Sequence, residues 1–289
     1  MTSDLKILVV GIMGATLLAS CDQPPPGEPV VRTEIRPTEA GTDAAMPDPS
    51  ISAQVESACR PIIFENEPFT HCLAIPSRHD IATVFSGPSG TPYRGFSAYL
   101  RDRQANAPSI SFAMNGGRFD EEGTPLGYLV QGAERVSELE RGDSPDGDQE
   151  NEFYLKPNGV FFGTDGDWQV RSTAWFLENV SERPQFGTQS GPMLVIDGAL
   201  HPALAVEGGT ETVRSAVGVD AAGRAHFVIS SAPVSLRKLA RLYRDEFETR
   251  NALALDGETS GLWNPARDRM DDNGPLGPLI VVTKVEDGE

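Results

Sequence analysis

The 289-residue sequence is poor in basic residues and in cysteine. Lysine and arginine total 24 against 42 aspartate and glutamate residues, so the formal net charge is −18. Proteins that bind nucleic acid or dock electrostatically on anionic lipid need a surplus of lysine and arginine. The composition therefore excludes nucleic acid as an expected partner.

Common metal, nucleotide and nucleophile motifs are also missing. There is no H-E-x-x-H, Walker loop or G-x-G-x-x-G, so we expect no cofactor, although a divalent cation stays open. Ser190 lies near a G-x-S-x-G pattern but at the wrong spacing for a serine hydrolase. The acidic run at 143–150 lacks calcium-loop spacing and indicates a mobile loop. The histidines have no partners at zinc spacing and are expected to be structural or on the surface: His71, His79, His201 and His226.

The N-terminus indicates export and lipidation. Residues 7–19 are an apolar stretch of 13 residues, shorter than the ~20 of a membrane-spanning helix but typical of a signal peptide. Leu18-Ala19-Ser20-Cys21 resembles the bacterial lipobox, which implies removal of residues 1–20 and anchoring to the bilayer through acylated Cys21. Asp22 resembles an inner-membrane retention signal. An ordinary cleaved signal is the alternative, and either one predicts a periplasmic protein.

A proline-rich tether is expected after the lipidated cysteine. Seven of the 29 residues from Asp22 to Ser50 are proline, and residues 22–57 contain no aromatic side chain. Such a segment buries too little apolar surface to order itself. We therefore divide the chain into a signal peptide at 1–20, a tether at 21–57 and a folded domain at 58–289.

Cys59 and Cys72 lie thirteen residues apart on two strand-like segments. Export would place them in an oxidising compartment, so we expect a disulfide that closes a hairpin. Two buried reduced thiols are the alternative.

Short β-rich runs separated by turns dominate residues 58–289. One clear helix is expected after Ser235, which has the character of an N-cap, and a shorter one at 96–104. Residues 160–163 and 168–171 flank a hairpin turn. We predict an α+β fold with a mixed, largely antiparallel sheet, a few flanking helices and a cleft at the strand ends. The expected strands are 69–75, 81–85, 109–114, 128–131, 159–162, 193–196, 213–219, 226–230, 252–255 and 279–283.

Four segments contain polar residues that could take part in binding or catalysis. Each joins an apolar strand to polar residues, and each taken singly is also explained as a turn. They are Ala113-Met-Asn-Gly-Gly-Arg-Phe-Asp120, Thr188-Gln-Ser-Gly-Pro192, Val213-Arg-Ser-Ala-Val-Gly-Val-Asp220 and Ala254-Leu-Asp-Gly-Glu-Thr-Ser-Gly261. Together they supply an arginine fork for phosphate, carboxylates for chemistry at an anomeric carbon and amides for sugar hydroxyls. This set is compatible with cleavage of a sugar phosphodiester but does not select it.

These four segments, in this order, resemble the phosphodiester glycosidase domain family. The likeness runs from about Cys59 to Lys284 and includes 153–161, 189–198, 227–230 and 251–263. It implies a hydrolase with a cleft at the strand ends and a glycan or sugar-phosphate substrate. Oligomeric state and stereochemistry are left open.

The resemblance implies roles for individual residues. Arg214 is assigned to the phosphate, and Asp256 and Glu258 are the candidate catalytic carboxylates. The expected substrate-binding residues are Asn115, Gly116, Gly117, Arg118, Gln189, Ser190 and Ser260. Two positions depart from the family pattern, since Glu258 replaces a Gly or Ser and Arg118 replaces an apolar residue.

Two functions follow. The first is a lipid-anchored periplasmic hydrolase that cleaves glycosyl phosphodiesters in envelope or extracellular glycans. The second, motivated by Glu258, is a non-catalytic glycan-binding envelope lipoprotein on the same scaffold. The hydrolase hypothesis requires the four segments to converge, with position 214 near positions 115 and 256, whereas the binding hypothesis would survive if they did not.

Overall fold

The computed structural model of the chain describes residues 57–144, 152–205, 208–255, 258–272 and 274–285. The predictions for the signal peptide, Cys21, Asp22, nearly all of the tether, and Asp256 lie outside these residues. Within them, no helix is long and apolar enough to cross a membrane.

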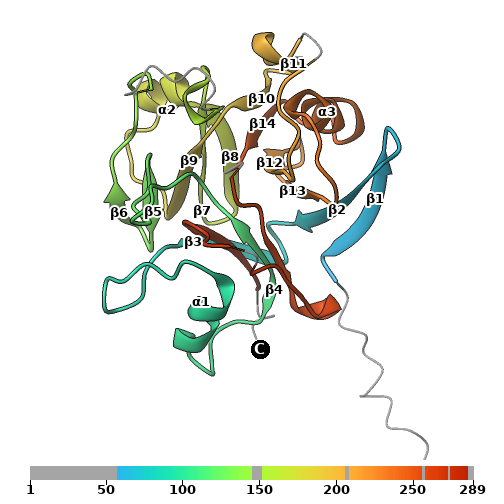
Figure 1. The fold of residues 1–289 in the computed structure, drawn as a ribbon. Helices are drawn as coiled ribbons and strands as arrows, with labels where there is room; N and C mark the ends of the chain where they lie inside the picture. Colours follow the sequence, from blue (N-terminus) through green and yellow to red (C-terminus); the bar gives the residue numbers. More distant parts are fainter. Residues whose placement is uncertain (1–56, 145–151, 206–207, 256–257, 273, 286–289) are drawn as a thin grey trace, which may run out of the picture. The chain divides into compact units, whose positions relative to one another are not determined.

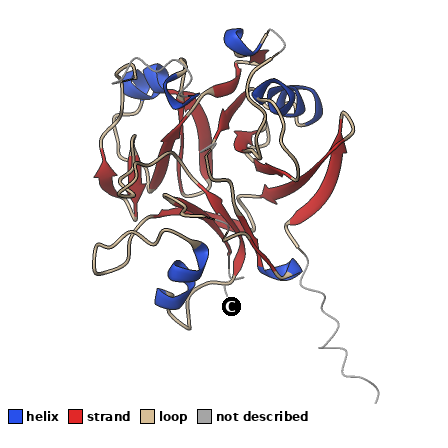
Figure 2. Cartoon of the chain, viewed as in Figure 1, coloured by secondary structure: helices blue, strands red, loops and turns tan. Residues whose placement is uncertain are grey.

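The strands form three antiparallel sheets, which we name by their central strands (Figures 1 and 2). The β12 sheet has the order β1-β2-β13-β12-β14-β10-β11, the β4 sheet β16-β15-β4-β17-β3, and the β9 sheet β6-β5-β9-β7-β8. The β12 sheet contains β1 (Cys59–Phe64), β2 (Glu67–Ala74), β10 (Met193–Ile196), β11 (Ala199–Leu200), β12 (Ser215–Val219), β13 (Ala225–Ser230) and β14 (Asn251–Ala254). The β4 sheet contains β3 (His79–Val84), β4 (Ile110–Asn115), β15 (Leu262–Asn264), β16 (Arg269–Met270) and β17 (Leu279–Lys284). The β9 sheet contains β5 (Leu129–Gln131), β6 (Glu134–Ser137), β7 (Gly159–Thr164), β8 (Asp167–Ser172) and β9 (Phe186–Ser190).

Short helices cover the sheets: α1 (Phe96–Asp102), α2 (Thr173–Asn179) and α3 (Leu236–Arg241), with a π-helical turn at Leu242–Glu246. In α3 the Ser235 side chain accepts a hydrogen bond from the Lys238 amide, so the predicted N-cap is confirmed. The α+β class, the largely antiparallel strands and the two expected helices are confirmed. The strands divide into three sheets, and every pairing between named strands is antiparallel.

Phe227 joins the three sheets at one point in the core. Its ring lies 5.2 Å from that of Phe112 in β4 and 5.7 Å from that of Phe161 in β7. All three side chains are fully buried. The next residue, Val228, points to the other face of β13 and packs in the cluster that contains Leu239 of α3. The β12 sheet is therefore buried on both faces.

The predicted disulfide is confirmed, since Cys59 and Cys72 are bonded directly across β1 and β2. In the chain-entropy description, closing a loop of this size stabilises a fold by about 3 kcal/mol. The Cys59→Ala/Cys72→Ala double variant should therefore lose about 3 kcal/mol of unfolding free energy in a denaturant titration. Reductant should destabilise the parent protein and leave the double variant unchanged. A reductant effect on both proteins would mean that the disulfide is not its cause.

Candidate functional site

The central strands of the three sheets bring the four predicted segments together. The first segment follows β4 and the second lies in β9. The third begins β12, and the fourth follows its neighbour β14. We call the meeting point the strand-end cluster and define it as Asn115, Gly116, Gly117, Thr188, Ser215, Ser260 and Gly261.

Asn115 is the hub of this cluster. Its side chain is buried, and its Oδ1 accepts hydrogen bonds from Ser215 Oγ at 2.9 Å and from the Gly261 amide at 3.1 Å. Ser260 Oγ lies 3.3 Å from Ser215 Oγ and donates to the Val213 carbonyl at 3.1 Å. One asparagine thus joins segments 100 and 146 residues away along the chain.

The two glycines after Asn115 let β4 approach its neighbours closely. The Gly116 amide donates to the Pro278 carbonyl at 2.6 Å, and the Gly117 amide donates to Thr188 Oγ1 at 3.0 Å. A Cβ atom at Gly117 would lie 2.0 Å from the Gln189 carbonyl oxygen, far inside van der Waals contact. Only glycine fits between β4 and β9 at this position.

The Gly117→Ala substitution should therefore destabilise the protein by about 3 kcal/mol, because backbone must move to relieve the overlap. Gly274→Ala is the matched control, since its nearest neighbour would lie at an ordinary contact distance of 3.5 Å. Urea unfolding of both variants measures the difference. Equal stability of the two variants would show that β4 and β9 separate at low cost.

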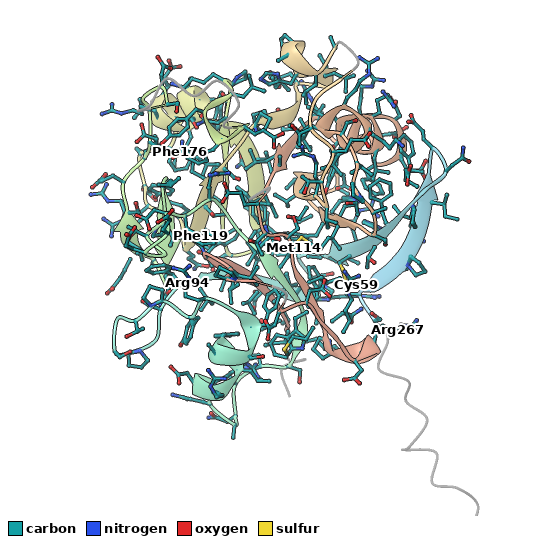
Figure 3. The ribbon with its side chains drawn as sticks, in the orientation of Figure 1. Cys59, Arg94, Met114, Phe119, Phe176 and Arg267 are labelled. Atoms are coloured by element: carbon teal, nitrogen blue, oxygen red, sulfur yellow. A yellow bond between two sulfur atoms is a disulfide. The ribbon has the colours of Figure 1, made fainter. Side chains whose placement is uncertain are left out.

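The loop after Gly117 is fixed by stacking and by an ion pair. Arg94 holds its guanidinium 5.2 Å from the centre of the Phe119 ring (Figure 3). Arg118 forms an ion pair with Glu258 of the fourth segment. Arg118 is mostly buried, whereas the Glu258 side chain is 66% exposed. The two positions that depart from the family pattern are thus partners of each other.

Arg214 is buried and faces away from Asn115. Its guanidinium makes a two-pronged pair with the Glu152 carboxylate at 2.6 and 2.8 Å, and it donates to the carbonyls of Val234 and Thr210 at 2.9 and 2.7 Å. Neighbouring residues of a strand point to opposite faces, so Ser215 reaches Asn115 while Arg214 reaches Glu152. Arg214 and Glu152 line a cavity of about 270 Å³ together with Leu155, Leu204, Leu236 and the backbone of 208–210.

The second segment has a structural role in this arrangement. Gln189 is buried, and its side-chain oxygen accepts from the amides of Tyr128 and Glu140 at 3.0 and 2.9 Å. Its side-chain nitrogen donates to the Glu140 carbonyl and to Thr173 Oγ1 at 2.7 and 3.1 Å. These four bonds use the hydrogen-bonding capacity of the amide, which corrects the expectation that Gln189 faces substrate. Ser190 is also buried, opposite Gly159 in β7.

Arg214 adjoins Ser215, which bonds Asn115, so the backbone at position 214 lies next to the cluster while its guanidinium pairs with Glu152 instead. The Leu255 amide donates to the Ser215 carbonyl at 3.0 Å, which brings the residue before Asp256 to the same place. Sequence reasoning missed Glu152, 62 residues from Arg214, because nothing local marks a distant ion-pair partner. Thr188 and Ser215 lie in the second and third of the four segments, but a threonine or a serine in a strand does not by itself indicate a role in the cluster. The described residues contain no group of three or more His, Cys, Asp or Glu side chains placed to hold a metal ion.

Comparisons with known proteins show which family and which fold this chain shares. Residues 109–283 match the family model described as phosphodiester glycosidase. YigE of Escherichia coli strain K12, described as uncharacterized, is 25% identical over 225 residues, which cover 78% of this chain and 79% of YigE. The catalytic domain of zebrafish N-acetylglucosamine-1-phosphodiester alpha-N-acetylglucosaminidase, solved in a form auto-inhibited by its pro-peptide, shares the fold with a TM-score of 0.51. Its sequence identity is 15%, and the match covers 79% of this chain and 82% of that one.

Proposed function

We propose that this chain, which belongs to the phosphodiester glycosidase family, hydrolyses glycosyl phosphodiesters of envelope or extracellular glycans. The observation that carries the proposal is the family match, because it spans all four segments that meet at the strand-end cluster. The zebrafish relative is named for cleavage of an N-acetylglucosamine phosphodiester, which suggests the first substrate to try.

Asp256 is the proposed catalytic carboxylate. A carboxylate next to an anomeric carbon acts as a nucleophile or as a general acid or base. Position 256 follows Leu255, whose amide donates to the Ser215 carbonyl, and Ser215 in turn bonds Asn115. Glu258, which forms an ion pair with Arg118, is the second candidate.

Arg214 is the proposed phosphate ligand. Carboxylate and phosphate both bind the planar guanidinium fork through two parallel hydrogen bonds. Glu152 therefore occupies the place that a substrate phosphate would take, at the wall of a cavity. We propose that the phosphate displaces the Glu152 carboxylate when substrate binds.

A test of the function uses protein that begins at residue 57, incubated with a synthetic N-acetylglucosamine phosphodiester and with analogues that carry other sugars. Release of the free sugar, followed by chromatography, is the expected result. Binding of the same compounds in calorimetry without turnover would support the non-catalytic glycan-binding alternative. Absence of both, in protein with native circular dichroism, would refute both functions.

We also propose that the protein is exported and held to a bacterial membrane by acylated Cys21. The lipobox-like residues 18–21 support this, and the Cys59–Cys72 disulfide suits an oxidising compartment. Metabolic labelling with a radioactive fatty acid should mark the parent chain and leave the Cys21→Ala variant unlabelled. Equal labelling of both chains would exclude Cys21 as the acylation site.

A further inference from the structure

A cavity at the opposite end of β17 from the strand-end cluster has no role in the proposed hydrolysis. Leu279, the first residue of β17, pairs with Asn115, whereas Lys284, the last residue of β17, lines this cavity. They are five residue steps apart along the strand, about 17 Å at the usual rise per residue. The cavity has a volume of about 540 Å³.

Three cations from three different segments line this cavity: Arg60 of β1, Arg78 before β3, and Lys284 of β17. Register brings them to the same place, because Arg60 lies opposite His71 in β2 and Lys284 lies opposite His79 in β3. Both histidines also line the cavity.

The described residues give this cavity a positive lining. Among them, none that lines it is an aspartate or a glutamate. Within the part of the chain that the structure describes, none of the three cations forms an ion pair. In a chain of net charge −18, three cations around one cavity with no ion-pair partner among the described residues form a local positive patch.

The two histidines that line the cavity, His71 and His79, are uncharged. Burial, with His226 and Arg60 nearby, lowers the pKa of His71 to about 3, and burial also lowers the pKa of His79. His226 bonds the Asp220 carboxylate through Nε2 at 3.1 Å and must donate there, so its Nδ1 accepts from His71 Nε2 at 3.1 Å. This leaves Nδ1 of His71 as a buried acceptor without a partner among the described residues.

We propose that this cavity binds a phosphate group, held by Arg60, Arg78 and Lys284. A phosphomonoester carries a charge of about −1.5 to −2 at neutral pH, which suits three cations better than a single carboxylate does. Arginine offers it two-pronged hydrogen bonds, and lysine adds a point charge. The site is separate from Arg214, so it stands or falls independently of the proposed hydrolysis.

Isothermal titration of the full-length protein with inorganic phosphate and with glucose 6-phosphate tests the proposal at low salt. Saturable binding is expected, and the Arg60→Gln/Arg78→Gln double variant should weaken it at least tenfold. Arg183→Gln/Arg250→Gln is the matched control, since it removes the same charge from exposed positions elsewhere and should leave the affinity unchanged.

Equal affinity for the two compounds would identify free phosphate as the ligand, and tighter binding of glucose 6-phosphate would identify a sugar phosphate. Binding should also weaken with added salt, since the three cations are exposed to solvent. Absence of saturable binding, or an equal loss of affinity in both double variants, would overturn the proposal.

Discussion

The Asp256→Asn variant is expected to cleave a glycosyl phosphodiester about 10²- to 10⁴-fold more slowly than the parent protein, with little change in stability. The amide keeps the size of the carboxylate but neither takes a proton nor attacks an anomeric carbon, and positioned proton transfer alone contributes a factor of this order. Initial rates at saturating substrate measure the effect on kcat.

Asp268→Asn is the matched control for this variant. Asp268 is exposed and adopts a left-handed backbone conformation with φ of 52°, which asparagine tolerates well. The control should retain parental kcat. If Asp256→Asn also retained more than half of it, Asp256 would lose its catalytic role and Glu258 would become the first candidate.

Replacing Arg214 with methionine is expected to lower kcat/KM at least 100-fold and to reduce the free energy of unfolding by about 3 kcal/mol. Removing one partner of a buried ion pair leaves the other charge uncompensated, and such changes cost 3–5 kcal/mol. We expect the lower end of this range, about 3 kcal/mol, because the Glu152 side chain keeps 29% of its surface exposed to solvent. Chemical denaturation and steady-state kinetics give the two values.

The Glu152→Gln variant tests whether Arg214 binds phosphate, independently of what Arg214 contributes to stability. If Glu152 occupies the fork that a phosphate takes, removal of its charge should lower KM severalfold while kcat stays the same. A purely structural Arg214 predicts an unchanged or higher KM in the same variant. This measurement keeps the phosphate assignment testable even if the Arg214 variant does not fold.

Much of the fold follows from local sequence patterns. Short β-rich runs bounded by turns predicted β2, β4, β7, β13 and β17, and a serine followed by helical spacing predicted α3. The strand β9 was missed because its residues, Phe-Gly-Thr-Gln-Ser, include two small and two polar types and show no apolar alternation. Its burial comes from pairing with β5 and β7, which sequence patterns do not report.

The site was predictable at the level of segments but not of side chains. The four segments meet, and the resemblance that selected them is supported by the family match. The directions of Arg214 and Gln189 were not predictable, because each depends on partners far along the chain, Glu152 and Glu140. The pairing of Arg118 with Glu258 likewise explains two departures that looked independent in the sequence.

The position of Phe227 has a consequence for how this domain comes apart. Because one ring contacts residues of the two other sheets, neither of those sheets can detach without opening a void beside it. Tryptophan fluorescence and far-ultraviolet circular dichroism should consequently report a single coincident transition on heating. The domain should then unfold as one cooperative unit, so a substitution that destabilises any of the three sheets should also destabilise the strand-end cluster around Asn115.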